Sequence, residues 1–236
     1  MMHRFFLNQA LDKEIIVIKD RAIAHQMRDV LKLRKGEKAA FFNANPEQIG
    51  FDFIAELKNI EGNAAVFMFR EKLENAREPS KKLVLYQSLI KKDKFEWALA
   101  KAAEVGISEI IPVISARSEK KSLNIERCSA ILKEAAEQSG RAIIPKLHNE
   151  IFFEKAVLMA QNSGYKTYFA DISEKENMVH GAGDRASNLF IGPEGGWEER
   201  EIFAAKRANF EMIFLSRLIL RSETAAVVAS YTLLWG

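Results

Sequence analysis

The chain has 236 residues, of which 48% are hydrophobic and 28% are charged, and its formal net charge is +3. These proportions are typical of a folded globular protein and exclude an intrinsically disordered chain. A single cysteine, Cys128, excludes an intramolecular disulfide and a metal site built from several cysteines.

The first part of the chain is predicted to be a small β-rich domain over residues 1–73. Its apolar runs are short, rich in Phe, Val and Ile, and separated by Asn, Gly and Pro. One amphipathic helix is predicted over residues 22–33. Five strands with one helix are typical of a small β-barrel, a fold that often binds nucleic acids. The predicted strands cover residues 4–7, 15–18, 39–42, 51–55 and 64–69.

A polar segment over residues 74–82, containing Pro79, is predicted to be a linker. The region 83–236 then alternates between strands and helices, which predicts an α/β domain with a mostly parallel sheet covered on both faces. Strands are expected at 83–86, 110–113, 167–170, 188–191 and 212–215. Helices are expected at 94–105, 124–139 and 152–160, and from residue 222 onward.

The most informative motif follows the strand at 188–191. The loop Gly192-Pro193-Glu194-Gly195-Gly196 leads into a helix that opens with acidic residues. Open α/β sheets bind ligands at the carboxyl ends of their strands, and glycines let the backbone approach a ligand closely. A simple tight turn is the alternative. The nearby segment 215–226, LSRLILRSETAA, favours one composite pocket built from both segments.

Two arginine-bearing helix ends are candidate functional sites. Arg141 follows Gly140 at the end of the helix over 124–139, where it is either an ordinary cation at a helix C-terminus or a group directed at the pocket. Arg221 and Glu223 open the last helix. Glu223 complements the helix dipole there, and both side chains are also suited to acid–base and anchoring roles.

Charge is distributed unevenly along the chain. Residues 76–146 carry an excess of Lys and Arg, residues 147–236 an excess of Asp and Glu, and a second basic cluster lies around Arg28 and Arg34. Basic patches attract polyanions, although lysines also commonly serve only to solvate helix faces. The four histidines lack metal-ligand spacing, so no metal is expected. The start of the chain lacks a signal peptide and no apolar run is long enough to span a bilayer, so we expect a cytoplasmic protein without a membrane partner.

Taken together, these motifs resemble the RsmE-type 16S rRNA (uracil-N3)-methyltransferases of the SPOUT, or trefoil-knot, superfamily. The matches span nearly the whole chain in order, and two positions depart from the family pattern, namely Ser216 and Trp197. The matching segments are MHRFF at 2–6, His25 with VLKLRKG at 30–36, KFE at 94–96, KAAEVG at 101–106, EAAEQSGR at 134–141, IGPEGG at 191–196 and LILRSETA at 218–225.

The resemblance implies a PUA-like RNA-binding β-barrel at the N-terminus and a methyltransferase domain that ends in a trefoil knot. It implies a homodimer, S-adenosylmethionine as the cofactor, and 16S rRNA as the substrate, expected within the assembled small ribosomal subunit. The implied cofactor contacts are Phe169, Ala170, Ile191, Gly192, Pro193, Glu194, Gly195, Gly196, Leu215, Ser216, Leu218, Ile219 and Leu220. The expected RNA contacts are Arg4, His25, Arg28, Arg34, Lys35, Lys91 and Lys92.

The expected chemistry is removal of the uracil N3 proton followed by attack of N3 on the sulfonium methyl group. Glu194 and Glu223 are candidate bases, and Arg141 and Arg221 are candidates for stabilising the uracil anion. Of these four, Arg141 and Glu223 are favoured. Three alternatives remain, namely a knotted methyltransferase with a tRNA target, a non-catalytic RNA-binding or ribosome-assembly factor, and a phosphate-binding metabolic enzyme.

Overall fold

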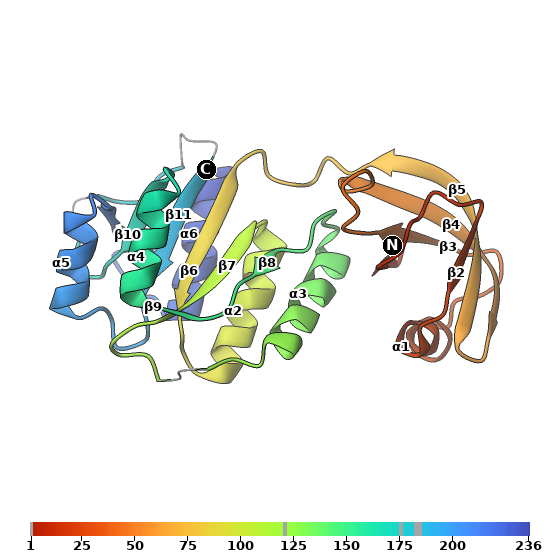
Figure 1. The fold of residues 1–236 in the computed structure, drawn as a ribbon, viewed down its shortest axis with the longest axis horizontal. Coiled ribbons are helices and arrows are strands. Elements are labelled where there is room, and N and C mark those ends of the chain that lie inside the picture. The colour runs from red at the N-terminus through yellow and green to blue at the C-terminus, as the bar shows by residue number, and fades with distance from the viewer. Residues whose placement is uncertain (1, 120–121, 175–176, 182–185) are drawn as a thin grey trace. The chain divides into compact units, whose positions relative to one another are not determined.

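The computed structural model describes residues 2–119, 122–174, 177–181 and 186–236 (Figure 1). The chain divides into two compact units. Unit 1 comprises residues 1–78 together with 137–143, and unit 2 comprises residues 79–136 and 144–236. Residues 137–143 therefore belong to unit 1, although the division drawn from the sequence leaves them in the C-terminal region. No helix among the described residues is both long enough and apolar enough to cross a bilayer.

Unit 1 is built on a five-stranded mixed sheet with the strand order β1-β3-β4-β5-β2. Strand β1 pairs in parallel with β3, and the other neighbours are antiparallel. The closed barrel predicted from the sequence is not confirmed, because β1 and β2 lie at opposite edges and no ladder joins them in the described residues. The strands are β1 (Arg4–Phe6), β2 (Ile15–Ile18), β3 (Lys38–Phe42), β4 (Phe51–Glu61) and β5 (Ala64–Glu74).

The helical segment of unit 1 is shorter than predicted. Helix α1 (Arg21–His25) starts at Asp20, whose carboxylate accepts hydrogen bonds from the amides of the first turn, and it continues as the π-helical turn η1 (Gln26–Val30). Lys32 then adopts a left-handed backbone conformation with φ of 53°, which ends the helix.

Unit 2 contains a seven-stranded parallel sheet with the order β12-β10-β11-β6-β7-β8, and β9 also pairs with β7. The strands are β6 (Lys82–Ser88), β7 (Glu109–Ile114), β8 (Lys146–Leu147), β9 (Ile151–Phe152), β10 (Lys166–Ala170), β11 (Ala186–Ile191) and β12 (Glu211–Ile213). The helices are α2 (Lys92–Val105), α3 (Ile125–Ser139), whose last turn belongs to unit 1, α4 (Phe153–Asn162), α5 (Glu199–Arg207) and α6 (Ser222–Trp235). This arrangement confirms the predicted α/β fold with a mostly parallel sheet.

Both faces of the unit 2 sheet are covered, because successive side chains of a strand point to opposite faces. On β6, Leu83 and Leu85 belong to one apolar core, whose helical residues come from α2, α3 and α6. Val84 and Tyr86 belong to the other core, with residues of α4 and α5. Figure 1 shows α4 and α5 in front of the sheet and α6 behind it.

Candidate functional site

The predicted ligand site corresponds to a cavity of about 300 Å³ at the carboxyl ends of β10 and β11 in unit 2. Parallel strands bring their carboxyl ends to the same edge, so the loops that follow them meet there. Three segments line the cavity, namely the chain after β10, the glycine loop after β11, and the chain from the end of β12 into α6. The lining residues are Ala170–Ile172, Glu174, Ile191–Glu194, Gly196, Trp197, Ile213–Ser222 and Ala225.

Side-chain hydrogen bonds fix the glycine loop from three directions. Ser222 Oγ donates to the Gly192 carbonyl at 2.5 Å, Arg117 donates to the Gly195 carbonyl at 2.7 Å, and Trp197 Nε1 donates to the Ala170 carbonyl at 2.9 Å. Each bond links the loop to a different segment of unit 2. These bonds tie both ends of the loop to neighbouring segments of unit 2.

The indole of Trp197 explains one departure from the family pattern. Trp197 is 6% exposed, and its ring packs against Phe169 at a centroid distance of 4.6 Å. A Cβ atom at Gly192 would lie 3.1 Å from this indole, so a side chain at position 192 would require the ring to move by a few tenths of an ångström. Trp197 and Gly192 thus pack closely in the wall of the cavity.

The start of α6 forms the opposite wall. Ser222 also accepts a hydrogen bond from the buried Gln87 Nε2 at 3.0 Å, which links the end of β6 through Ser222 to Gly192. Glu223 is buried, and its carboxylate lies 4.0 Å from Lys94 Nζ of α2. Arg221, the residue before α6, lines the cavity.

The structure brings together most of the predicted cofactor contacts. Eleven of them line the cavity, as does the candidate catalytic residue Arg221, whereas Phe169 and Gly195 do not. Phe169 is fully buried behind Trp197, and Gly195 points its carbonyl to Arg117. Glu223 lies next to the lining residue Ser222 without itself lining the cavity. Sequence reasoning missed Asp171, Ile172, Glu174, Trp197, Ile213 and Phe214 as lining residues. Arg217, Ser222 and Ala225 lie in the segment 215–226 that it assigned to the pocket.

Arg141 belongs to unit 1, where its guanidinium is buried. Its Nη2 donates to the carboxylate of Glu78 at 2.7 Å, and the same carboxylate accepts the backbone N–H groups of Ala142 and Ile143 at 2.9 and 3.1 Å. Arg4 donates to the Arg141 carbonyl at 2.9 Å. Within unit 1, these contacts make Arg141 an anchor for the segment 137–143.

The basic residues predicted to contact RNA differ in their surroundings. Arg4 is largely buried and paired with Asp52 at 2.5 Å. Arg28 is exposed and hydrogen-bonds Asp29, an interaction that, with His25, lowers the pKa of Asp29 to about 2. Exposed side chains suited to phosphate contact are those of His25, Arg28, Arg34 and Lys35 in unit 1 and Lys91 and Lys92 in unit 2.

The cavity suits a ligand that is partly apolar and partly cationic. Its volume is at the lower end of the range of about 300–1,000 Å³ that is typical of small-molecule sites. Ile191, Leu215 and Leu220 contribute apolar surface, and the carboxylate-bearing residues Asp171 and Glu194 also line it. These properties fit S-adenosylmethionine, which combines an adenine ring with a positively charged sulfur. No described group of three or more His, Cys, Asp and Glu residues is arranged to hold a metal ion.

Comparison with known proteins gives a consistent result. The model of an RNA methyltransferase domain family matches residues 77–234. The chain is 30% identical over 235 residues to ribosomal RNA small subunit methyltransferase E of Rickettsia conorii, covering 96% of this chain and 93% of that protein. The protein of the same name from Bacillus subtilis is 28% identical, with 87% and 84% covered.

The solved structures agree. Ribosomal RNA small subunit methyltransferase E of Neisseria gonorrhoeae, crystallised with S-adenosylmethionine, superposes with a TM-score of 0.83 at 26% identity, covering 98% of this chain and 95% of that one. The fold of a probable rRNA methyltransferase from Porphyromonas gingivalis is also similar, with a TM-score of 0.81 at 20% identity and coverage of 97% and 95%. The chain therefore belongs to the RNA methyltransferase family, together with the ribosomal RNA small subunit methyltransferase E proteins.

Proposed function

We propose that this protein uses S-adenosylmethionine to methylate N3 of a uridine in 16S ribosomal RNA, forming 3-methyluridine. The observation that carries the proposal is the cavity at the ends of β10 and β11, where the glycine loop and the segment before α6 meet. Family membership and the S-adenosylmethionine-bound relative support the choice of cofactor. The N3 position and the target rRNA come from the resemblance to the RsmE-type enzymes, and we expect a cytoplasmic enzyme acting on the assembled small subunit.

When bound, S-adenosylmethionine supplies an electrophilic methyl group on a positively charged sulfur. The glycine loop, Ala170 and residues 215–220 would hold it mainly through backbone groups, because few of these residues carry polar side chains. The hydrogen bonds from Ser222 and Trp197 preorganise this wall, so that little conformational entropy is lost when the ligand binds.

The protein must also remove the proton from uracil N3 and stabilise the resulting anion. We propose Glu223 as the base, with Glu194 as the second candidate, because both carboxylates come from segments that form the cavity walls. Arg221 lines the cavity and supplies positive charge for the uracil anion. Arg141 remains a candidate for the same role, and its pairing with Glu78 means that its test must separate catalysis from folding.

The finer fold is also part of the proposal. We infer a PUA-like RNA-binding role for unit 1 and a trefoil knot in unit 2. In support of the knot, β12 lies at the edge of the sheet beyond β10, whereas α6, the next element, packs against β6 and β11. The intervening residues 214–221 must therefore run back past the glycine loop, with which they share the cavity lining.

We further propose a homodimer. Val228, Tyr231 and Trp235 recur at helical spacing on α6 and are 37–58% exposed, which leaves an apolar stripe without cover in the described residues. Leu218 and Ile219, in the loop that lines the cavity, are 77% and 85% exposed. Analytical ultracentrifugation checks the dimer, and a monomer at micromolar concentration would contradict it.

The experiment that tests the function uses small ribosomal subunits from cells that lack this protein. The subunits are incubated with the protein and S-adenosylmethionine, and nucleosides from the recovered 16S rRNA are measured by mass spectrometry. 3-Methyluridine is the expected product. Another methylated nucleoside would support methyltransferase activity but exclude uracil N3 as the methylated atom. If neither methylation nor cofactor binding is detected, an RNA-binding factor without catalysis becomes the better explanation.

The roles of the two glutamates are separated by Glu223→Gln and Glu194→Gln. The base is the residue whose substitution lowers kcat by about 100-fold or more while the affinity for S-adenosylmethionine is retained. Equal rates for both variants and the unchanged protein would remove both residues from the mechanism.

A further inference from the structure

Gln87, near the carboxyl end of β6, is a buried amide beside an apolar core. The residue is 1% exposed. It lies on the face of the sheet covered by α2 and α6, because Leu83 and Leu85, four and two positions earlier on the strand, belong to the core formed with these helices. Burial of an amide costs free energy unless its polar groups are hydrogen-bonded. The hydrogen bonds of the amide therefore determine what Gln87 contributes.

The contacts of the Gln87 amide fix its orientation. Its Nε2 lies 3.0 Å from the Ser88 carbonyl oxygen and 3.0 Å from Ser222 Oγ. The carbonyl oxygen can only accept a hydrogen bond. The Ser222 hydroxyl has a single proton, which it donates to the Gly192 carbonyl at 2.5 Å, so Ser222 Oγ accepts from Gln87. Because both neighbours are acceptors, the nitrogen of the amide faces them and not the oxygen.

These bonds form a chain that leads from the sheet to the glycine loop. Gln87 Nε2 donates to Ser222 Oγ, which in turn donates to the Gly192 carbonyl. The chain joins the end of β6, the first turn of α6 and the loop after β11. It begins at a fixed position in the sheet, because Gln87 pairs with Ile191 in the ladder between β6 and β11. Hydrogen bonds in series polarise one another, so the bond to Ser222 strengthens the bond to Gly192.

The chain ends at a peptide group of the cofactor cavity. The Gly192 carbonyl belongs to the peptide that joins Gly192 to Pro193, and both residues line the cavity. Proline has no backbone N–H, so the carbonyl is the only hydrogen-bonding group of this peptide. The bond from Ser222 therefore restricts the rotation of the peptide plane at the start of the glycine loop. Ser222 lines the cavity, whereas Gln87 lies behind it.

We propose that Gln87 is a positioning residue for S-adenosylmethionine binding and acts through Ser222. It directs the hydroxyl proton of Ser222 to Gly192 and ties the first turn of α6 to the glycine loop. Gln87 itself does not contact the ligand. This role rests on the proposed function, because the glycine loop is assigned there to the binding of S-adenosylmethionine.

The oxygen of the same amide makes Gln87 suitable for substitution. Gln87 Oε1 is buried and has no hydrogen-bond partner among the described residues. An unpaired buried acceptor is unfavourable, and replacement of a buried polar group by an apolar group of the same shape is often nearly neutral for folding. Methionine has a similar length to glutamine and no N–H donor. Gln87→Met therefore removes the first bond of the chain together with the unpaired oxygen.

The test is a double-mutant cycle of Gln87→Met, Ser222→Ala and the variant with both substitutions, in the full-length protein. S-adenosylmethionine affinity is measured by isothermal calorimetry and the melting temperature by circular dichroism. Gln87→Met is expected to weaken binding by about tenfold, the ratio equivalent to one hydrogen bond, with little change in melting temperature. Ser222→Ala is expected to weaken binding at least as much. Gln87→Met then has no further effect in the Ser222→Ala protein, because the chain is already broken.

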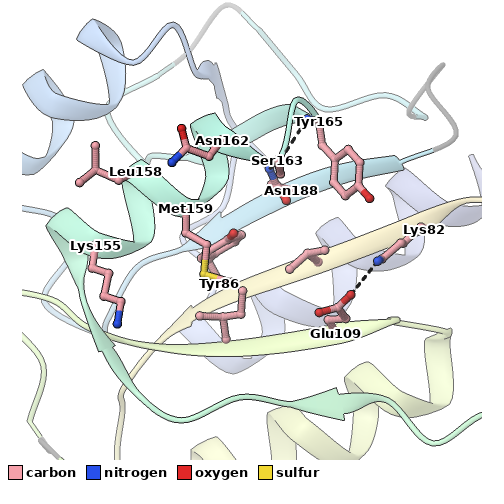
Figure 2. A pocket seen from close by; sticks show the side chains of 12 residues that line it. Lys82, Tyr86, Glu109, Lys155, Leu158, Met159, Asn162, Ser163, Tyr165 and Asn188 are labelled. Atoms are coloured by element: carbon pink, nitrogen blue, oxygen red, sulfur yellow. Dashed lines mark hydrogen bonds and ion pairs between the residues drawn. The ribbon is translucent and has the colours of Figure 1, made fainter.

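Asn188→Leu is the matched control, because it also replaces a buried amide of the same sheet by an apolar side chain. Asn188 lies on β11, its Nδ2 is hydrogen-bonded to Ser163 and Thr167, and its Oδ1 has no partner within the part of the chain that is described. Figure 2 shows the bond to Ser163 as a dashed line. None of these three residues lines the cofactor cavity, so Asn188→Leu is expected to leave the affinity unchanged.

The outcomes separate a positioning role from a purely structural one. Gln87→Leu, a second apolar replacement of different shape, is expected to give the same loss of affinity as Gln87→Met. Unchanged affinity in both variants would overturn the proposal, as would losses that add to that of Ser222→Ala, or an equal loss in Asn188→Leu. Absence of S-adenosylmethionine binding in the protein without substitutions would contradict the proposed cofactor and, with it, the role of Gln87.

Discussion

Replacement of Trp197 by Phe tests the hydrogen bond that joins the glycine loop to the end of β10. Trp197 Nε1 donates to the Ala170 carbonyl at 2.9 Å. Phenylalanine retains an aromatic ring that packs against Phe169 and Phe153, but it removes this donor. The variant therefore isolates a polar contact between two segments that line the cofactor cavity.

The magnitude follows from burial. Trp197 is 6% exposed, and leaving a buried acceptor without its partner costs about 1–3 kcal/mol. For a chain of this size, that loss lowers the melting temperature by about 2–12 °C. The matched control is Trp97→Phe on α2, which makes the same substitution at a position that does not line the cofactor cavity. Trp97 is 45% exposed, so the expected loss is below about 0.5 kcal/mol.

The assay is urea unfolding followed by tryptophan fluorescence. All three tryptophans of the chain, Trp97, Trp197 and Trp235, lie in unit 2, so the signal reports this unit even if the two units unfold separately. Calorimetric titration with S-adenosylmethionine is expected to show weaker binding for Trp197→Phe alone. Equal stability losses in the two variants, or unchanged stability and cofactor affinity in Trp197→Phe, would refute the reasoning.

Three further predictions concern other parts of the chain. Arg141→Ala should destabilise unit 1 by about 3–5 kcal/mol, because it leaves the carboxylate of Glu78 without its ion pair; an unchanged calorimetric transition would contradict this. Burial raises the pKa of Glu109, but hydrogen bonds from Lys82 and His148 outweigh it, so the folded-state pKa lies below the ordinary 4.5. Ionised Glu109 thus stabilises unit 2 above about pH 4.5, and this contribution disappears as pH falls through the lowered pKa; Glu109→Gln should flatten the acid side of the stability profile. Burial also raises the pKa of the Cys128 thiol, so iodoacetamide should modify it only slowly until the protein is unfolded, as mass spectrometry would show.

The sequence predicts the elements of unit 2 well because their signals are local. The apolar run before Gly192 and the change to helical periodicity after Trp197 both mark the loop that lines the cavity. Contacts between distant residues leave no such signal. The Trp197–Ala170 bond joins residues 27 positions apart, and the pairing of Arg141 with Glu78, 63 positions apart, makes the segment 137–143 part of unit 1.

Strand propensity has the same limit. It identifies the five strands of unit 1. A closed barrel would also require the two edge strands, β1 and β2, to pair with each other. Strand propensity does not determine which strands pair, because pairing depends on contacts between distant residues. The two-residue strands β8 and β9 are too short to have a periodicity. The surroundings of single buried polar residues are the least predictable feature. From the sequence, Asn188 is only a polar residue within a buried strand, and the three hydrogen bonds of its amide nitrogen are known only from the structure.

The exposed loop residues connect cofactor binding with the proposed homodimer. Leu218 and Ile219 line the cofactor cavity and yet are 77% and 85% exposed. Exposure of these apolar side chains to water is unfavourable unless another surface covers them. If a second copy covers them, dimerisation and cofactor binding stabilise each other by linkage. Diluting the protein below its dimer dissociation constant should then weaken S-adenosylmethionine binding, and the double substitution Leu218→Ser with Ile219→Ser should weaken both dimer and cofactor affinity. A cofactor affinity that is independent of protein concentration would mean that each protomer completes its own cavity, and it would contradict the coupling.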